Sequence, residues 1–280
     1  MPLFMHGKNR KLKNSYQKNK ENLKMIYHST VRNPQIPTGK TDPVQVCIPR
    51  EGSARTRMLL CDWESGVPEY PVQQGNEEFI FYILEGEGSI SSENAKLELK
   101  KDTFVYLPSH CTWQLESSKD KPLKHLLFSA LLNREPSTHR QSKIVNDIMG
   151  GRRYEFGSNS TILVLDRAEA EQCETTVVSW PPHNRGAMVA HNDKEQTFYV
   201  LSGSGNVTVD GETRKVSPGD IIFVPFNTPH TTEAGDETLT YLCINTIVAE
   251  KKYTTFDEMY HLVIGDRMRR WKEKDDSVGL

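Results

Sequence analysis

The chain has 280 residues, of which 36% are hydrophobic and 26% are charged, and its formal net charge is −2. This composition excludes a largely disordered chain, and the length suits two domains of about 100–150 residues each. No apolar run approaches the roughly 20 residues of a membrane-spanning helix, residues 1–9 are too polar for a secretory signal, and the five cysteines form no CxxC pair. We therefore expect a cytoplasmic protein with no disulfide framework, no zinc knuckle and no membrane partner.

Residues 1–25 form a basic segment that differs from the rest of the chain. They carry seven Lys or Arg and one acid, whereas the remainder is acidic. A basic arm can bind nucleic acid or a membrane surface, but this one lacks apolar periodicity and has few aromatic residues. We interpret it as a disordered leader, or as sequence ahead of a true start at Met25. The acidic body argues against nucleic acid as the main ligand.

An internal repeat organises the rest of the chain. When the chain is shifted by 117 residues, FIFYILEGEGSI (79–90) aligns with QTFYVLSGSGNV (196–207) without a gap. Such a repeat predicts two domains of one fold. We expect an N-terminal domain at 26–135, a linker at 136–158, a C-terminal domain at 159–250, and a helix and tail at 251–280. The paired landmarks are Trp63 with Trp180, Glu78 with Glu195, Gly86 with Gly203, Gly88 with Gly205, and Pro108 with Pro225.

Both repeats have the pattern of short β-strands. Phe79–Leu84 and Thr197–Leu201 are aromatic and β-branched runs that end at glycine-rich turns. Asn206–Asp210 alternates polar and apolar residues ahead of a hairpin turn at Asp210-Gly211. Short strands punctuated by Gly and Pro indicate an all-β barrel or sandwich. The linker pattern predicts one short helix around residues 142–149.

A second helix is expected after the second repeat. Thr255 can cap it, and Glu258, three residues later, completes a capping box. Apolar residues then recur at helical spacing through Ile264. We expect this helix to pack on a barrel or on a neighbouring subunit.

Two groups of residues in the second repeat resemble the motifs of the cupin superfamily. One group is Gly219, Pro225, Asn227 and His230, and the other is His191, Gln196 and Gly203. The family motifs are G-x5-P-x-G-x2-H-x3-N and G-x5-HxH-x3-4-E-x6-G, and Asn227 can replace the second Gly because both residues tolerate positive φ. The resemblance covers about residues 45–135 and 160–248. It implies an all-β fold of two tandem cupin barrels, each a double-stranded β-helix or jelly roll.

Among two-barrel cupins, or bicupins, one intact barrel beside a degenerate one resembles the ureidoglycine aminohydrolases. Quercetinase-like dioxygenases also have two barrels. The aminohydrolase pattern expects Glu where Val189 stands and His where Glu195 stands. The sequence therefore does not assign that activity.

The resemblance also implies a metal inside the second barrel. Carried over residue by residue, its ligands fall on His191, Gln196 and His230, whereas Val189 occupies a family His position and cannot ligate. Glu195 is an alternative to Gln196, because adjacent strand residues point to opposite faces and only one can face the interior. Spacing favours Gln196, and the carboxylate charge favours Glu195. We expect one divalent transition metal, Mn, Fe, Zn or Ni, in the C-terminal domain only.

The first repeat lacks these ligands. At the 117-residue offset, Gln74, Phe79 and Trp113 stand where the second repeat has His191, Gln196 and His230. These side chains do not suit a divalent metal, so the first barrel is expected to be structural or a metal-free small-ligand site.

The resemblance implies a metal-dependent enzyme that acts on a small polar or carboxylated metabolite by dioxygenase, isomerase or aminohydrolase chemistry. The alternative is a non-enzymatic small-ligand-binding cupin. We expect a small-molecule substrate and a homo-oligomer, in the simplest case a homodimer. The residues expected to contact the substrate are Tyr199, His183, Tyr241 and Asn245.

Overall fold

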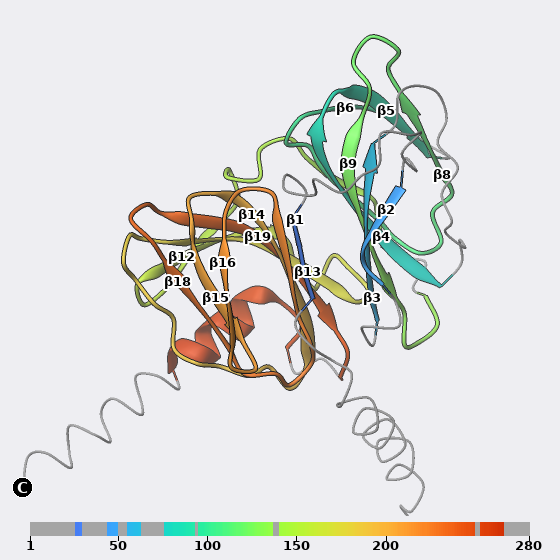
Figure 1. Ribbon diagram of the computed structural model, residues 1–280. Helices are drawn as coiled ribbons and strands as arrows, with labels where there is room; N and C mark the ends of the chain where they lie inside the picture. Colours follow the sequence, from blue (N-terminus) through green and yellow to red (C-terminus); the bar gives the residue numbers. More distant parts are fainter. Residues whose placement is uncertain are drawn as a thin grey trace, which may run out of the picture.

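The structure, a computed structural model, describes residues 26–29, 44–49, 55–62, 76–92, 95–136, 140–249 and 253–265. The basic leader expected at 1–25 lies outside these residues. Figure 1 shows two β-lobes side by side, one from each half of the chain, with a helix against the C-terminal lobe. Within the described ranges, no helix has the length and hydropathy needed to cross a membrane.

The N-terminal barrel combines a six-stranded sheet with a three-stranded sheet. The larger sheet has the order β10 (Lys143–Val145), β7 (Phe104–Leu107), β4 (Glu77–Glu85), β9 (Lys124–Leu131), β3 (Thr56–Asp62) and β2 (Val44–Ile48). The smaller sheet has the order β6 (Ala95–Lys100), β5 (Glu87–Ser92) and β8 (Trp113–Ser117).

The C-terminal barrel combines a seven-stranded sheet with a three-stranded sheet. The larger sheet has the order β1 (Ile26–Ser29), β17 (Asp220–Val224), β14 (Lys194–Ser202), β19 (Leu239–Ile247), β13 (Cys173–Trp180), β12 (Asn159–Leu165) and β11 (Arg153–Phe156). The smaller sheet has the order β16 (Glu212–Val216), β15 (Gly205–Val209) and β18 (His230–Ala234).

The sequence repeat is a structural repeat. β4 and β14 occupy the same positions at the 117-residue offset, and their neighbours correspond. Phe79 on β4 lies opposite Leu107 and Ser129, and Gln196 on β14 lies opposite Val224 and Asn245. The all-β fold of two barrels with a short C-terminal helix is therefore confirmed.

Two strands pair with sheets that lie outside the domain or linker in which the sequence placed them. β1 pairs with β17 of the C-terminal barrel, and β10 pairs with β7 of the N-terminal barrel, where Lys143 lies opposite Tyr106. The short helix predicted around 142–149 is wrong, because Lys143–Val145 form a strand on an open sheet edge whose backbone groups need partners. The sheets thus draw strands from both sides of the expected domain boundaries.

Local turn and cap predictions are confirmed. Asp210 and Gly211 both have positive φ, 50° and 82°, as the hairpin between β15 and β16 requires. The helix spans 256–265, and the Thr255 hydroxyl accepts a hydrogen bond from the Glu258 backbone N–H. Its aromatic face packs on β11, with Phe256 against Tyr154 at a ring-centroid distance of 4.8 Å.

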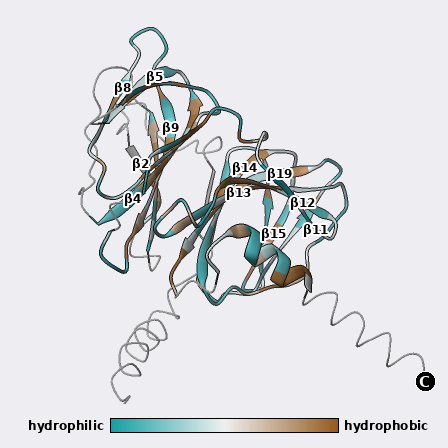
Figure 2. Cartoon of the chain, turned by 180° about the vertical axis from the view of Figure 1, so that it is seen from behind, coloured by the Kyte–Doolittle hydropathy of each residue, from teal (hydrophilic) through white to brown (hydrophobic). Residues whose placement is uncertain are grey.

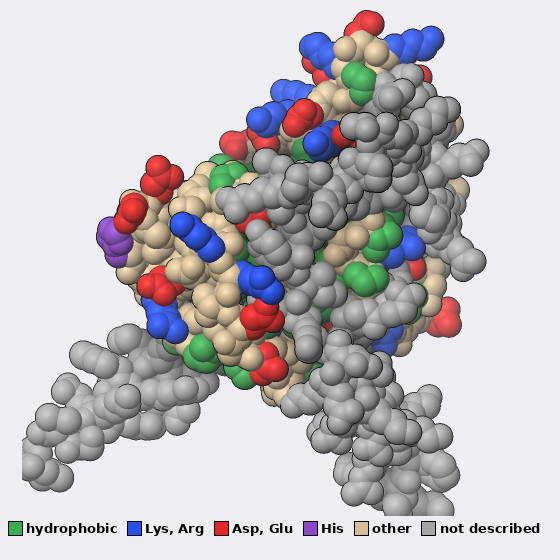
Figure 3. Space-filling model, viewed as in Figure 1, with side chains coloured by type: hydrophobic (Ala, Val, Ile, Leu, Met, Phe, Trp, Pro, Cys, Tyr) green, Lys and Arg blue, Asp and Glu red, His purple; other side chains and the backbone are tan. Residues whose placement is uncertain are grey.

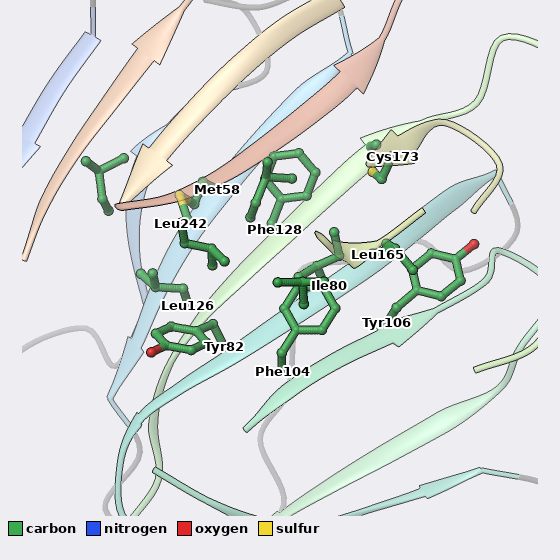
Figure 4. Packing of buried hydrophobic residues seen from close by; sticks show 14 of the residues in the cluster. Met58, Ile80, Tyr82, Phe104, Tyr106, Leu126, Phe128, Leu165, Cys173 and Leu242 are labelled. Carbon is green, nitrogen blue, oxygen red and sulfur yellow. The ribbon is translucent and has the colours of Figure 1, made fainter. Parts of the chain in front are cut away.

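The larger sheets of the two barrels pack against each other through a shared apolar core. Tyr82, Phe104 and Phe128 from the N-terminal barrel and Leu165 and Leu242 from the C-terminal barrel belong to this core. Figure 4 shows these side chains converging from strands of both barrels, and Figure 2 shows apolar residues along strands of both barrels. Strands of the larger sheets are therefore buried on both faces, one toward the barrel interior and one toward the other barrel.

Two glutamates at equivalent repeat positions connect the barrels across this interface. Glu78 accepts hydrogen bonds from the backbone N–H groups of Glu171 (2.9 Å) and Gln172 (2.6 Å), on the C-terminal side. Glu195 accepts hydrogen bonds from the Arg55 backbone N–H (3.2 Å) and the Thr56 hydroxyl (3.1 Å), on the N-terminal side. We call this pair the reciprocal carboxylate contacts.

The visible surface carries both signs of charge. Figure 3 shows acidic and basic side chains interspersed on the described part of this face, without an extended basic area. The five cysteines, all within the described residues, form no disulfide.

Candidate functional site

The two family-matched histidines meet inside the C-terminal barrel. Val189 and His230 exchange backbone hydrogen bonds of 3.0 and 2.8 Å, so the segment before His191 runs antiparallel to the start of β18. The His191 carbonyl also accepts the Asn227 backbone N–H at 2.8 Å. Asn227 has a φ of 54°, as expected for the residue that replaces the motif glycine. The two imidazole rings lie 5.3 Å apart between centroids.

The His230 ring has a defined tautomer. Its Nδ1 lies 2.9 Å from the Thr228 carbonyl oxygen, which can only accept, so Nδ1 carries the proton and Nε2 keeps a lone pair. Burial, followed by the nearby Lys194 and His230 charges, lowers the pKa of His191 to about 2. Burial is also the main reason that the pKa of His230 is lowered. Both rings are therefore neutral at physiological pH, which is the form that ligates metals.

A chain of buried polar side chains fixes the orientation of Gln196. The Arg167 guanidinium pairs with Glu174 at 2.5 Å, and the Asn245 amide N–H donates to the other Glu174 oxygen at 3.0 Å. Because a carboxylate only accepts, the Asn245 Oδ1 must point the other way, where it accepts the Gln196 Nε2–H at 2.9 Å. Gln196 Oε1 is then left buried without a hydrogen-bond partner among the described residues.

The interior of the C-terminal barrel is layered. Glu174, Asn245 and Gln196 lie directly opposite one another on β13, β19 and β14 and form a polar row. The next layer along the strands is apolar. It contains Phe198 and Tyr241, whose ring centroids are 4.7 Å apart, and Cys243. Burial raises the pKa of the Cys243 thiol to about 12, so the side chain is a thiol and not a reactive thiolate.

The structure separates Glu195 from Gln196. Glu195 is 1% exposed, and its carboxylate points out of the barrel into the contact with Arg55 and Thr56. The outer face of a single barrel would be exposed to solvent at this position. Glu195 is instead buried because the N-terminal barrel covers the outer face of β14.

The expected substrate-contact residues divide into two groups. Tyr241 and Asn245 lie inside the C-terminal barrel, where the Tyr241 hydroxyl accepts the Trp180 indole N–H at 3.1 Å. Tyr199 lies on the outer face of β14 against Tyr82, at 5.9 Å between ring centroids, so it does not line the interior. His183 lies on an exposed loop with a φ of 60°, and its side chain is 73% exposed.

Lys194 is a residue of this site that the sequence did not reveal. It precedes Gln196 by two positions on β14 and therefore shares its inward face. It is buried at 9% exposure, and its charge contributes to the lowered pKa values of both His191 and His230. The only available sequence signal was this parity with Gln196, because no family motif position falls on Lys194.

The N-terminal barrel has no such arrangement among the described residues. Phe79 and Trp113, which take the places of Gln196 and His230, pack together at 5.6 Å between ring centroids. Trp113 also contacts Phe81 at 5.0 Å. Gln74, the counterpart of His191, lies outside the described residues. Apolar volume fills this barrel where the other barrel has polar groups.

The described residues contain no cluster of three or more His, Cys, Asp or Glu that could hold a metal. The candidate ligands in the C-terminal interior are two neutral imidazoles and the amide oxygen of Gln196, which has no hydrogen-bond partner among the described residues. Two nitrogens and one oxygen fit a divalent transition metal with open coordination positions, although the set carries no negative charge.

Residues 176–245 match the family model for the cupin domain. The fold of the chain is that of two tandem cupin barrels. Over 64 residues it is 36% identical to an uncharacterized protein of Methanocaldococcus jannaschii, a match that covers 22% of this chain and about half, 51%, of that relative.

Solved cupin structures resemble most of the chain. Protein Ylba from E. coli superposes with a TM-score of 0.62 and 12% identity, covering 82% of this chain and 94% of that one. A cupin 2 conserved barrel domain protein from Leptotrichia buccalis gives a TM-score of 0.54 and 18% identity, over 72% and 88% of the two chains. Oxalate decarboxylase from Bacillus subtilis, a protein with Mn(II) centres, gives 0.55 and 14%, over 74% of each chain. At these identities the likeness concerns the fold alone.

Proposed function

We propose that this two-barrel cupin holds one divalent transition metal in its C-terminal barrel and acts there on a small polar or carboxylated metabolite. His191, His230 and Gln196 would be the ligands. The observation that carries the proposal is Gln196 Oε1, which the Arg167–Glu174–Asn245 chain holds without a partner in the barrel that contains both histidines. A buried unpaired acceptor costs free energy unless something binds it.

The residues around the proposed metal site suit the binding of one small substrate molecule beside the metal. A bound metal would supply Lewis-acid polarisation of a carbonyl or carboxylate, or activation of oxygen. The polar row holds the Gln196 amide in place, and Phe198 and Tyr241 form an apolar floor that excludes water from one side. Reactions of the dioxygenase, isomerase or aminohydrolase type are compatible with this arrangement. Mn is the first metal to test, because the structurally similar oxalate decarboxylase has Mn(II) centres.

Metal content after reconstitution tests the proposal. The purified protein is stripped with a chelator, incubated separately with Mn²⁺, Fe²⁺, Zn²⁺ and Ni²⁺, desalted and measured by elemental analysis. We expect about one metal ion per chain for at least one of these ions, and loss of that ion in the double variant His191→Ala/His230→Ala. Trp113→Phe, at the equivalent position of the other barrel, is the matched control. Metal retained by the double variant would reject the site.

A metal-free small-ligand-binding cupin is the second candidate. The neutral donor set and the buried Lys194 charge beside both histidines favour it, because a cation opposes the binding of another cation. On this reading His191, His230 and Gln196 would bind the ligand through hydrogen bonds. A protein that binds none of the four metals, yet is stabilised by a small carboxylate in the presence of chelator, would establish this candidate instead.

A further inference from the structure

Lys194 is a buried cation whose charge no described residue neutralises. Within the described ranges it forms no ion pair, although it is only 9% exposed. A mostly buried lysine that pairs with no acid among the described residues can bind the anionic group of a ligand through a charge-assisted hydrogen bond. The buried Arg167, by contrast, is paired with Glu174.

Lys194 shares the inward face of β14 with Gln196, two residues away, and the pKa shifts of neighbouring groups agree with this placement. It disfavours the protonated forms of His191 and His230 and favours the thiolate of Cys243. All three side chains belong to the C-terminal barrel, so the ammonium lies within electrostatic range of the histidine pair. Lys194 and Gln196 stand two residues apart on one face of β14, a separation of about 6.6 Å along a strand.

The N-terminal barrel provides an internal comparison. At the positions equivalent to Lys194 and Gln196 it has Glu77 and Phe79. Opposite Phe79 lie Ser129 and then Arg57, where the C-terminal barrel has Asn245 and Glu174. The cation, the polar row and the two histidines therefore occur together in one barrel and are all replaced in the other.

We propose that Lys194 is the carboxylate-recognition residue of the C-terminal site and that it selects small 2-hydroxy or 2-keto carboxylates. This inference rests on the proposed function, because the neighbouring oxygen of the same molecule is assigned to the site of His191, His230 and Gln196. One ammonium matches one carboxylate. Lys194 and Gln196 lie two residues apart on one face of β14, so a small acid can reach both side chains. The carboxylate would also supply the negative charge that the neutral ligand set lacks.

The test compares acids with their uncharged amides. Lactate and pyruvate are titrated against lactamide and pyruvamide, with affinities measured by saturation-transfer NMR on wild type, Lys194→Met and Lys194→Arg. We expect wild type and Lys194→Arg to prefer the acids by about 10-fold or more, the effect of one hydrogen bond to a charged group. Lys194→Met should lose this preference while its affinity for the amides stays within a few-fold. Lys215→Met, which removes an exposed lysine on β16, is the control and should match wild type.

Metal content measured on the same samples separates this inference from the proposed function. Lys194→Met should bind the metal at least as tightly as wild type, because a repelling charge is removed; a general loss of structure would lower both metal and ligand affinity. If wild type binds no metal but still prefers the acids and Lys194→Met does not, the proposed metal site fails and Lys194 keeps its role. If Lys194→Met prefers the acids as wild type does, or if wild type has no preference for the acids, the inference is overturned. Should Lys194→Met fail to fold, Lys194→Gln takes its place in the same comparison.

Discussion

Glu195→Ala and Gln196→Ala are neighbouring substitutions on β14 that we expect to change different properties. Glu195 accepts hydrogen bonds from the Arg55 N–H and the Thr56 hydroxyl in the other barrel. Hydrogen bonds to a charged group contribute about 1.5–3 kcal/mol each, so Glu195→Ala should lower the free energy of unfolding by about 3 kcal/mol or more. For a chain of this size that corresponds to a fall in Tm of about 6–12 °C. Metal affinity should stay within about 2-fold.

Gln196→Ala should show the opposite pattern. It removes one neutral hydrogen bond to Asn245, worth about 1 kcal/mol, and it removes the oxygen that we propose as a ligand. Metal affinity should fall by about 10-fold or more, since even the loss of supporting residues around a metal costs 10–100-fold. Thermal unfolding is measured on chelator-treated protein, so that bound metal does not add to the stability difference. Affinity is measured by competition with a chromogenic chelator. If Glu195→Ala strips the metal and Gln196→Ala does not, the assignment of the two faces of β14 is refuted.

Three further predictions concern separate parts of the molecule. His191→Ala and His230→Ala should each reduce bound metal to background in elemental analysis, and normal content in either variant would contradict the ligand set. Gly211→Ala, at a φ of 82°, should cost about 1 kcal/mol in urea unfolding without changing metal content; an unchanged stability would contradict the hairpin geometry. Burial lowers the pKa of His125 from 6.5 to about 3, so its neutral ring contributes full stability above about pH 6.5, and this contribution is lost as the pH falls toward 3. At 1.36 kcal/mol per pH unit, the free energy of unfolding should fall by about 2 kcal/mol between pH 6.5 and pH 5. His125→Leu should abolish this fall, which is measured by urea unfolding at pH 7.5 and pH 5. An equal fall in the variant would disprove the burial argument.

The sequence was sufficient for the features that depend on local chemistry. The Asp210-Gly211 hairpin, the Thr255 cap and the strand at Thr197–Leu201 follow from turn residues, capping residues and β-branched runs. The 117-residue offset also holds where β4 pairs with β7 and β14 pairs with β17, because Phe79 lies opposite Leu107 and Gln196 lies opposite Val224. On the other side of these strands the offset is 116, since Phe79 lies opposite Ser129 and Gln196 lies opposite Asn245. The segment around 142–149 was misread, since its strand exists only by pairing with the edge of β7, a long-range contact that no local pattern encodes.

The faces of β14 could not be read from alternation. A strand buried on both sides is apolar at nearly every position, so Phe198 and Tyr199 look alike in sequence although one faces the barrel interior and the other faces Tyr82. Family spacing identified Gln196 as the residue on the same inward face as Phe198. The same spacing said nothing about Lys194, and the covering of Glu195 by a second barrel has no signature in a single repeat.

The repeat landmark Glu78/Glu195 has a structural meaning that its sequence position concealed. In each barrel this glutamate lies on the outer face of the equivalent strand and accepts backbone N–H groups from the other barrel, at residues 171 and 172 in one case and at residue 55 in the other. Position 172 minus the repeat offset is 55, so the two contacts are related by the repeat itself. The two barrels therefore share the outer face that joins them, but their interiors differ. Phe79 and Trp113 lie inside the N-terminal barrel, and Gln196 and His230 lie inside the C-terminal barrel. The reciprocal carboxylate contacts therefore join the barrels through the outer faces of β4 and β14, while the inward faces of the same two strands carry an apolar residue, Phe79, in one barrel and a polar residue, Gln196, in the other.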